Sequence, residues 1–109
     1  MFDNYVPAPV DTSRVVLSDE MTRLIDRLAF NYHETLVKEH RDAGWKFGDR
    51  RDYVKRTHPG MIPYDDLTDD MKRKNVRLAE EMVKAILVMG YDITPVKEQA
   101  DHCSDSDNE

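Results

Sequence analysis

Two amphipathic segments, one on each side of a long connector, are the feature that most constrains the fold of this chain. In each segment apolar residues recur at steps of three and four, which predicts an α-helix with one apolar stripe. The first stripe consists of Met21, Leu24, Ile25, Leu28, Ala29, Tyr32 and Leu36. The second consists of Met71, Leu78, Ala79, Met82, Val83, Ile86 and Leu87.

Capping residues set the expected limits of both helices. Ser18 and Thr68 are good N-caps, and each is followed by two acidic residues that favour a helix N-terminus. Gly44 and Gly90 are natural C-terminal stops. We expect the two stripes to face each other in an antiparallel pair.

The bulk composition suits one small soluble domain. The chain has 109 residues, of which 39% are hydrophobic and 35% charged. It has no apolar run long enough to span a membrane and no signal-peptide pattern at its N-terminus. Its single cysteine, Cys103, lies in a polar segment, so a disulfide framework is not expected and a reducing compartment fits. We expect a cytoplasmic protein.

The two ends of the chain are expected to lie outside the helical body. Pro7 and Pro9 discourage helix, so residues 1–16 are predicted to form an extended N-terminal arm. Tyr5, Val6 and Val10 are expected to pack this arm on the domain. Residues 96–109 are predicted to form a disordered acidic tail. Positions 97–109 hold one lysine against five acidic residues, which is −4 of the total net charge of −6.

The connector, residues 44–67, is too long to be a simple turn. Connectors of more than about 12–15 residues are usually functional or disordered, and aromatic residues and prolines argue against disorder. Residues 45–47 are predicted to form a very short strand, residues 57–60 a turn, and residues 61–64 a short extended piece fixed by Pro63.

The connector also carries a local basic cluster. Positions 46–58 have a net charge of +3, with two aspartates, Asp49 and Asp52, against Lys46, Arg50, Arg51, Lys55 and Arg56. Such a patch suits one phosphate group, because arginine offers paired donors to phosphate oxygens. It is a poor footprint for duplex nucleic acid. The alternative is a solvated loop whose basic residues pair with these aspartates or with the acidic run at 65–70.

Aromatic side chains on the connector have two interpretations. Trp45 and Phe47 could stack on a purine ring, or they could fill the core beneath the connector. Tyr64 is expected to clamp the connector, and its hydroxyl could also meet a ligand at the edge of a cleft.

Histidines and carboxylates give no pattern of a metal site or of catalysis. His33 and His58 have no cysteine or carboxylate at ligand spacing, so we expect them to fix the connector to the first helix by hydrogen bonds. The carboxylates Asp65, Asp66, Asp69 and Asp70 do not match a calcium-binding loop. Because no catalytic motif is present either, we expect no enzyme activity, no cofactor and no metal.

Several spaced motifs together resemble the RyR domain, the repeat named after the ryanodine receptors. They are Tyr-Val-Pro-Ala-Pro-Val-Asp-Thr at 5–12, Leu-Ala-Phe-Asn-Tyr-His-Glu at 28–34, Gly-Trp-Lys-Phe-Gly at 44–48, His-Pro at 58–59, Pro-Tyr-Asp-Asp-Leu at 63–67 and Leu-Val-Met-Gly-Tyr at 87–91. The resemblance implies a mainly α fold with minor β, in which a two-helix unit carries short strands in its connector. We place this domain at residues 5–95, and the short chain is similar to stand-alone members of bacteria and phages.

The resemblance also implies a function. The family has a proposed role in binding adenine nucleotides or related signals, and in the receptors such units form tandem pairs about a pseudo-two-fold axis. We therefore expect a sensor or sequestering module, which recreates the pair as a homodimer. The expected ligand-binding residues are Trp45, Phe47, Arg50, Arg51, Lys55, His58 and Tyr64. The alternative is a protein–protein interaction module without a small-molecule ligand.

This chain departs from the family pattern at two places. Leu36 stands where the family often has a tryptophan, a plausible stacking platform for a base. Asn75 and Val76 stand where the family often has an Asp-Arg pair.

Overall fold

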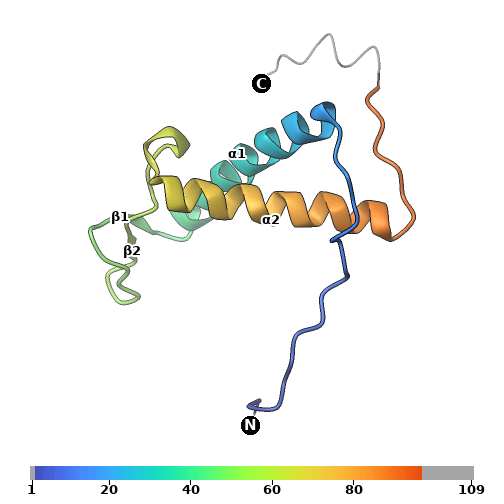
Figure 1. Cartoon of the computed structure of the whole chain (residues 1–109). Coiled ribbons are helices and arrows are strands. Elements are labelled where there is room, and N and C mark those ends of the chain that lie inside the picture. The colour runs from blue at the N-terminus through green and yellow to red at the C-terminus, as the bar shows by residue number, and fades with distance from the viewer. Residues whose placement is uncertain (1, 97–109) are drawn as a thin grey trace.

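The computed structural model describes residues 2–96, which form two long helices joined by a connector with a minimal sheet (Figure 1). The order of elements is α1 (Asp19–Asp42), β1 (Lys46–Phe47), β2 (Thr57–His58), a 3₁₀ helix (Tyr64–Asp66) and α2 (Asp69–Val88). The fold is therefore mainly α with minor β, as the sequence predicts. Neither described helix has an apolar stretch long enough to cross a membrane.

Both helices begin and end where their capping residues predict. The hydroxyl of Ser18 accepts a hydrogen bond from the Met21 amide, and that of Thr68 accepts one from the Met71 amide. Gly44 and Gly90 follow the C-caps with φ angles of 92° and 96°. This left-handed conformation favours glycine, which explains why each helix ends there.

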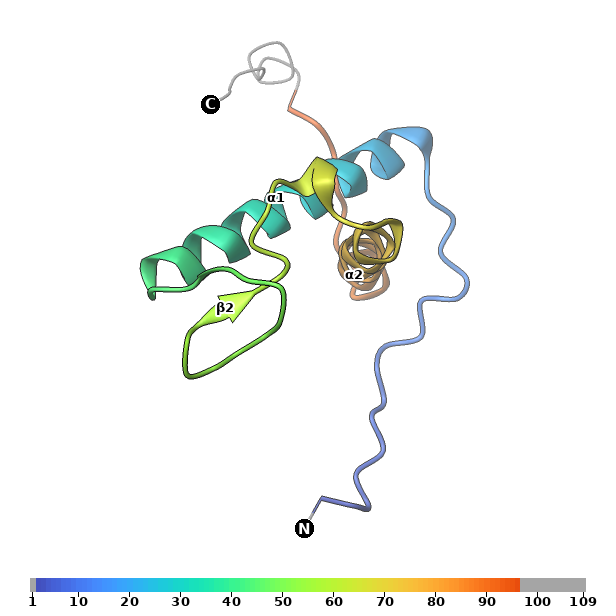
Figure 2. The same cartoon turned by 90° about the vertical axis from the view of Figure 1, so that its left-hand side faces the viewer.

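The two stripes face each other as expected, but the helices cross steeply, so the expected antiparallel pair is wrong (Figures 1 and 2). In Figure 2, α2 is seen nearly end-on while α1 runs across the view. The core at the crossing consists of Ile25, Ala29, Ala79 and Val83, with Leu17, Val76, Leu87 and Ile93 packed around it. Ala29 is 0% exposed, and small residues at a crossing let two helices approach closely there and diverge elsewhere.

The short sheet holds the connector together. β1 pairs with β2 in parallel, with Lys46 opposite Thr57 and Phe47 opposite His58. The strand at 46–47 confirms the sequence prediction, whereas the turn expected at 57–60 was wrong for its first two residues, which form β2. The chain reaches β2 through Arg56, whose φ of 57° is unusual for a residue other than glycine. Its guanidinium donates to the Ala43 carbonyl at 2.6 Å, which ties this bend to the end of α1.

The N-terminal arm contacts the body through an unexpected residue. Thr12 is buried, and its hydroxyl donates to Glu81 of α2 at 2.9 Å. Tyr5 and Val6 are 72% and 79% exposed, so the expected packing of the arm through Tyr5, Val6 and Val10 was wrong. Figures 1 and 2 show the arm leading away from both helices. The predicted acidic tail falls, apart from Val96, outside the described residues.

Candidate ligand-binding cleft

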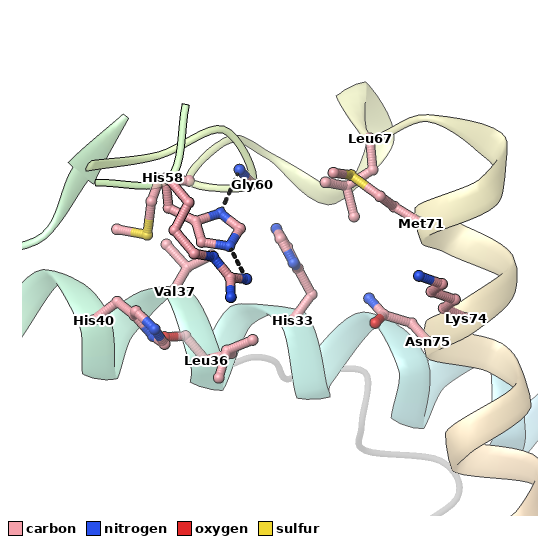
Figure 3. A pocket seen from close by; sticks show the side chains of 12 residues that line it. His33, Leu36, Val37, His40, His58, Gly60, Leu67, Met71, Lys74 and Asn75 are labelled. Atoms are coloured by element: carbon pink, nitrogen blue, oxygen red, sulfur yellow. Dashed lines mark hydrogen bonds between the residues drawn. The ribbon is translucent and has the colours of Figure 1, made fainter. Parts of the chain in front are cut away.

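A cleft of about 270 Å³ lies where α1, the connector and the first turns of α2 meet (Figure 3). Three elements contribute to its wall. The lining residues are His33, Leu36, Val37 and His40 from α1, Arg51, His58, Gly60, Met61 and Leu67 from the connector, and Met71, Lys74 and Asn75 from α2. Two of the predicted ligand-binding residues, Arg51 and His58, are therefore in this cleft.

His33 joins the floor of the cleft to the connector. Its side chain is buried, and its Nε2 lies 2.7 Å from the carbonyl oxygen of Ile62. A carbonyl can only accept, so Nε2 carries the proton and donates it. This contact confirms that His33 fixes the connector to the first helix. The same expectation was wrong for His58, whose ring has its hydrogen-bond contacts with Arg51 and Gly60 of the connector itself.

His58 is placed between two hydrogen-bond donors. Its Nδ1 accepts from the Gly60 amide at 2.8 Å, and its Nε2 lies 2.7 Å from a guanidinium nitrogen of Arg51, as the dashed lines in Figure 3 mark. A neutral imidazole has one donor and one acceptor nitrogen. The Arg51 N–H is directed at Nε2, so each ring nitrogen of His58 faces a donor, and a neutral ring accepts from only one of the two at a time.

The surroundings keep His58 neutral. Burial lowers the pKa of His58 below its ordinary value of 6.5, and the nearby Arg51 and His40 lower this pKa further. Neutral His58 can therefore accept from Arg51 and hold its guanidinium at the cleft. A guanidinium has five N–H donors, so Arg51 can also donate to the oxygen of an anion.

The α2 wall of the cleft also carries a positive charge, as the connector wall does. Lys74 and Asn75 project from α2 into the cleft (Figure 3). The twelve lining residues include Arg51 and Lys74 but no aspartate or glutamate. The cleft is thus electropositive, with an apolar wall that includes Leu36, Leu67 and Met71.

Trp45 and Phe47 line a second hollow of about 470 Å³, which is larger than the cleft. Val37 and Met61 line both hollows, so the two adjoin. The Trp45 ring meets His40 edge-on at 5.4 Å between centroids, and it meets Tyr53 edge-on at 5.7 Å. Trp45 is half-buried by these contacts, and it supports His40, which lines the cleft.

The other three predicted residues line neither hollow. Arg50 accepts a hydrogen bond at its carbonyl from the Thr57 hydroxyl, and the Lys55 amide donates to Asp52. Tyr64 packs edge-on against Phe30 and His33, and burial raises the pKa of its hydroxyl. This packing agrees with the predicted clamp. Among residues 2–96, the salt bridges include none between a basic residue of the connector and Asp49, Asp52 or the acidic run at 65–70.

Sequence reasoning missed the contribution of α2 to the cleft. Lys74 stands among many charged residues of a helix, and only the helix crossing places it opposite Arg51. The sequence did hold one signal for this wall of the cleft. Leu36 and Asn75, one residue from each of the two places where the chain departs from the family pattern, both line the cleft. Within the described part of the chain, no three His, Cys, Asp or Glu side chains gather as a metal site.

Comparison with known protein families agrees with the resemblance that the sequence motifs indicate. A family model described as the RyR domain matches residues 5–95. The match includes every element of the structure and all residues of the cleft. It also has the limits that the sequence motifs predict.

Proposed function

The chain belongs to the RyR domain family, and on this premise we propose that it is a small-ligand-binding module, a sensor or sequestering protein for an adenine nucleotide or a nucleotide-derived signal. The observation that carries the proposal is the positive charge of the cleft, which Arg51 and Lys74 line without any aspartate or glutamate. A phosphate oxygen of the ligand would accept from the Arg51 guanidinium, which His58 holds in place.

The anionic group of the ligand is the best-defined part of the proposal. Hydrogen bonds to charged groups contribute about 1.5–3 kcal/mol each. Arg51 supplies such a bond, and Lys74 adds a second positive charge from α2. Because neutral His58 can accept from Arg51, it positions this guanidinium without taking up a proton.

The rest of the ligand would lie against apolar side chains. A cleft of 270 Å³ is slightly smaller than the roughly 300–1,000 Å³ of typical ligand sites. A nucleotide therefore extends beyond it, and the adjoining hollow is one direction open to it. Trp45 and Phe47 lie on that path, where stacking on a base is worth about 1–3 kcal/mol.

We propose binding without catalysis. The residues that line the cleft include no serine, cysteine, aspartate or glutamate that could act as a nucleophile. Its charged side chains, Arg51 and Lys74, are donors, which suits recognition of an anion.

A thermal-shift panel tests the proposal. ATP, ADP, AMP, cyclic nucleotides, NAD and ADP-ribose are added to the intact chain at low salt, because salt screens the exposed charges. Binding to the native state raises the melting temperature with ligand concentration. We expect a dose-dependent rise with at least one adenine compound.

Adjacent arginines provide a matched pair of variants. Arg51→Gln removes a donor from the cleft, and we expect the dissociation constant to rise about ten-fold or more. Arg50→Gln removes the same charge outside the cleft and should leave the affinity within about two-fold. A flat panel, or equal losses in both variants, would contradict the proposal.

The alternative function, protein–protein interaction without a small ligand, has one observation in its favour. Leu78 and Met82 on α2 and Tyr32 on α1 are exposed apolar side chains. A chain with this function would show no saturable stabilisation by any compound of the panel.

A further inference from the structure

The N-terminal arm carries apolar side chains that its own chain does not cover. Phe2, Tyr5, Val6 and Val10 are all exposed, and Asp3 is the only charged side chain among residues 2–10. Isolated exposed apolar residues are common, but several within nine residues form a surface suited to contact with another apolar surface.

The local structure directs this arm away from its own body. Thr12 is held on α2 by its hydrogen bond to Glu81, and the Asp11 carboxylate accepts from the Ser13 amide just beyond. On the N-terminal side, Pro7 and Pro9 fix φ and keep the preceding residues extended. The arm therefore does not fold back over α1 or α2 (Figures 1 and 2). Residues 2–5 form a turn in which the Tyr5 amide donates to the Phe2 carbonyl at 3.1 Å, so the extended part is residues 5–10, which reach about 20 Å.

A matching surface lies on α2. Leu78, Met82, Ile86 and Met89 recur at steps of four, four and three, so they share one side of the helix. We call these four residues the outer stripe. All four are exposed, and Met82 is 70% exposed. The outer stripe is next to Glu81, where the arm is attached.

We propose that residues 2–10 of one copy lie along the outer stripe of a second copy, and that the second copy reciprocates, in a two-fold dimer. Each copy carries one arm and one outer stripe. A two-fold axis therefore forms two equivalent arm–stripe contacts, which cover the arm and the outer stripe of both copies. Because the arm leaves from α2 itself, pairing two α2 helices brings each arm to the stripe of the partner.

Because the core is small, the exchange of arms would add apolar surface that each copy does not bury alone. Four buried residues form the centre of the described chain. Small domains with few buried residues commonly gain the rest of their buried surface through oligomerisation. The proposal concerns the outer stripe and not the cleft, so it stands or falls independently of the ligand.

Analytical ultracentrifugation of the full chain tests the dimer. We expect a mass of twice 12.7 kDa at tens of micromolar. The variant Tyr5→Ser/Val6→Ser removes the apolar arm contact, and Met82→Glu places a charge on the outer stripe. Each should weaken the dimer about ten-fold or more. Val54→Ser is the control, because Val54 is also exposed but lies on the connector.

Mixing the two variants distinguishes arm exchange from a loss of folding in either one. The arm variant keeps an intact stripe, and Met82→Glu keeps an intact arm, so an equimolar mixture should form dimers more readily than either variant alone. Helix content measured by circular dichroism should match the parent chain in each case. A photo-crosslinker at position 5 should label α2 of the other copy.

Three results would overturn the proposal. They are a monomer at tens of micromolar, a dimer unaffected by both the arm and the stripe variants, and a crosslink from position 5 to α2 of the same chain.

Discussion

At the scale of single residues, His58 is the most informative side chain. The Gly60 amide and the Arg51 guanidinium both approach its ring within hydrogen-bond distance, and a neutral ring can accept from only one of them. The sequence shows a histidine beside a proline and a basic cluster nearby, but not this geometry. It also cannot separate Arg50 from Arg51, because the path of the connector decides which of the two adjacent side chains faces the cleft.

Stability should depend on pH through His58. Its pKa is lower in the folded state than its ordinary value of 6.5, so below pH 6.5 the unfolded chain binds the proton more readily. The contribution of neutral His58 is therefore complete above pH 6.5 and is lost as the pH falls. In His58→Asn, the amide oxygen can still accept from Gly60 but does not titrate. We expect its melting temperature to fall less than that of the parent between pH 7.5 and 5.

Melting curves at several pH values check this expectation. Parallel pH profiles for the two proteins would show that His58 takes no part in the acid destabilisation.

At the scale of elements, the helices were predictable and the connector was not. The limits of α1 and α2 follow from local signals, namely the caps Ser18 and Thr68 and the stops Gly44 and Gly90. The pairing of β1 with β2 depends on the left-handed bend at Arg56, which local sequence preference disfavours. Parallel pairing of two-residue strands within one connector has no periodic signature, so Thr57 and His58 were expected in a turn.

Gly48 should be essential for that pairing. A Cβ at position 48 would lie 2.5 Å from the Cβ of Thr57, so Gly48→Ala forces β1 away from β2. We expect a loss of about 1–3 kcal/mol in the free energy of unfolding, as for other overpacked sites. Because β2 carries His58, ligand affinity should fall as well.

Urea unfolding measures the stability change. Asp49→Ala, at the exposed neighbouring position, is the control and should change the free energy of unfolding by less than about 0.5 kcal/mol. Equal stability of Gly48→Ala and the parent would contradict the close contact between the strands.

At the scale of the whole molecule, the steep crossing of the helices creates the cleft. The crossing brings Lys74 and Asn75 of α2 to face Arg51 and His58 of the connector. The stripes in the sequence predict that the helices pack, but they do not predict the angle. The sequence consequently predicted two cleft residues on the connector and missed those on α2.

The crossing depends on very few buried side chains. Val83 is the largest fully buried side chain, and Val83→Ala removes two methyl groups from the centre of the core. We expect a loss of about 2 kcal/mol in the free energy of unfolding. Val88→Ala makes the same change at an exposed position of α2 and should cost less than about 0.5 kcal/mol, apart from helix propensity. Chemical denaturation measures both changes. Equal losses of unfolding free energy in the two variants would show that the core is not centred on Val83.

The most direct test of the cleft is a ¹H–¹⁵N spectrum of the imidazole rings in the intact chain at pH 7, recorded during titration with ADP-ribose and, separately, with ATP. The structure predicts that free His58 is neutral and contacts the Arg51 guanidinium through Nε2. At least one titration should shift the His58 ring signals and the Arg51 side-chain N–H signal together, to saturation. If free His58 is doubly protonated at pH 7, or if a compound binds while both residues stay unchanged, the cleft is not the ligand site.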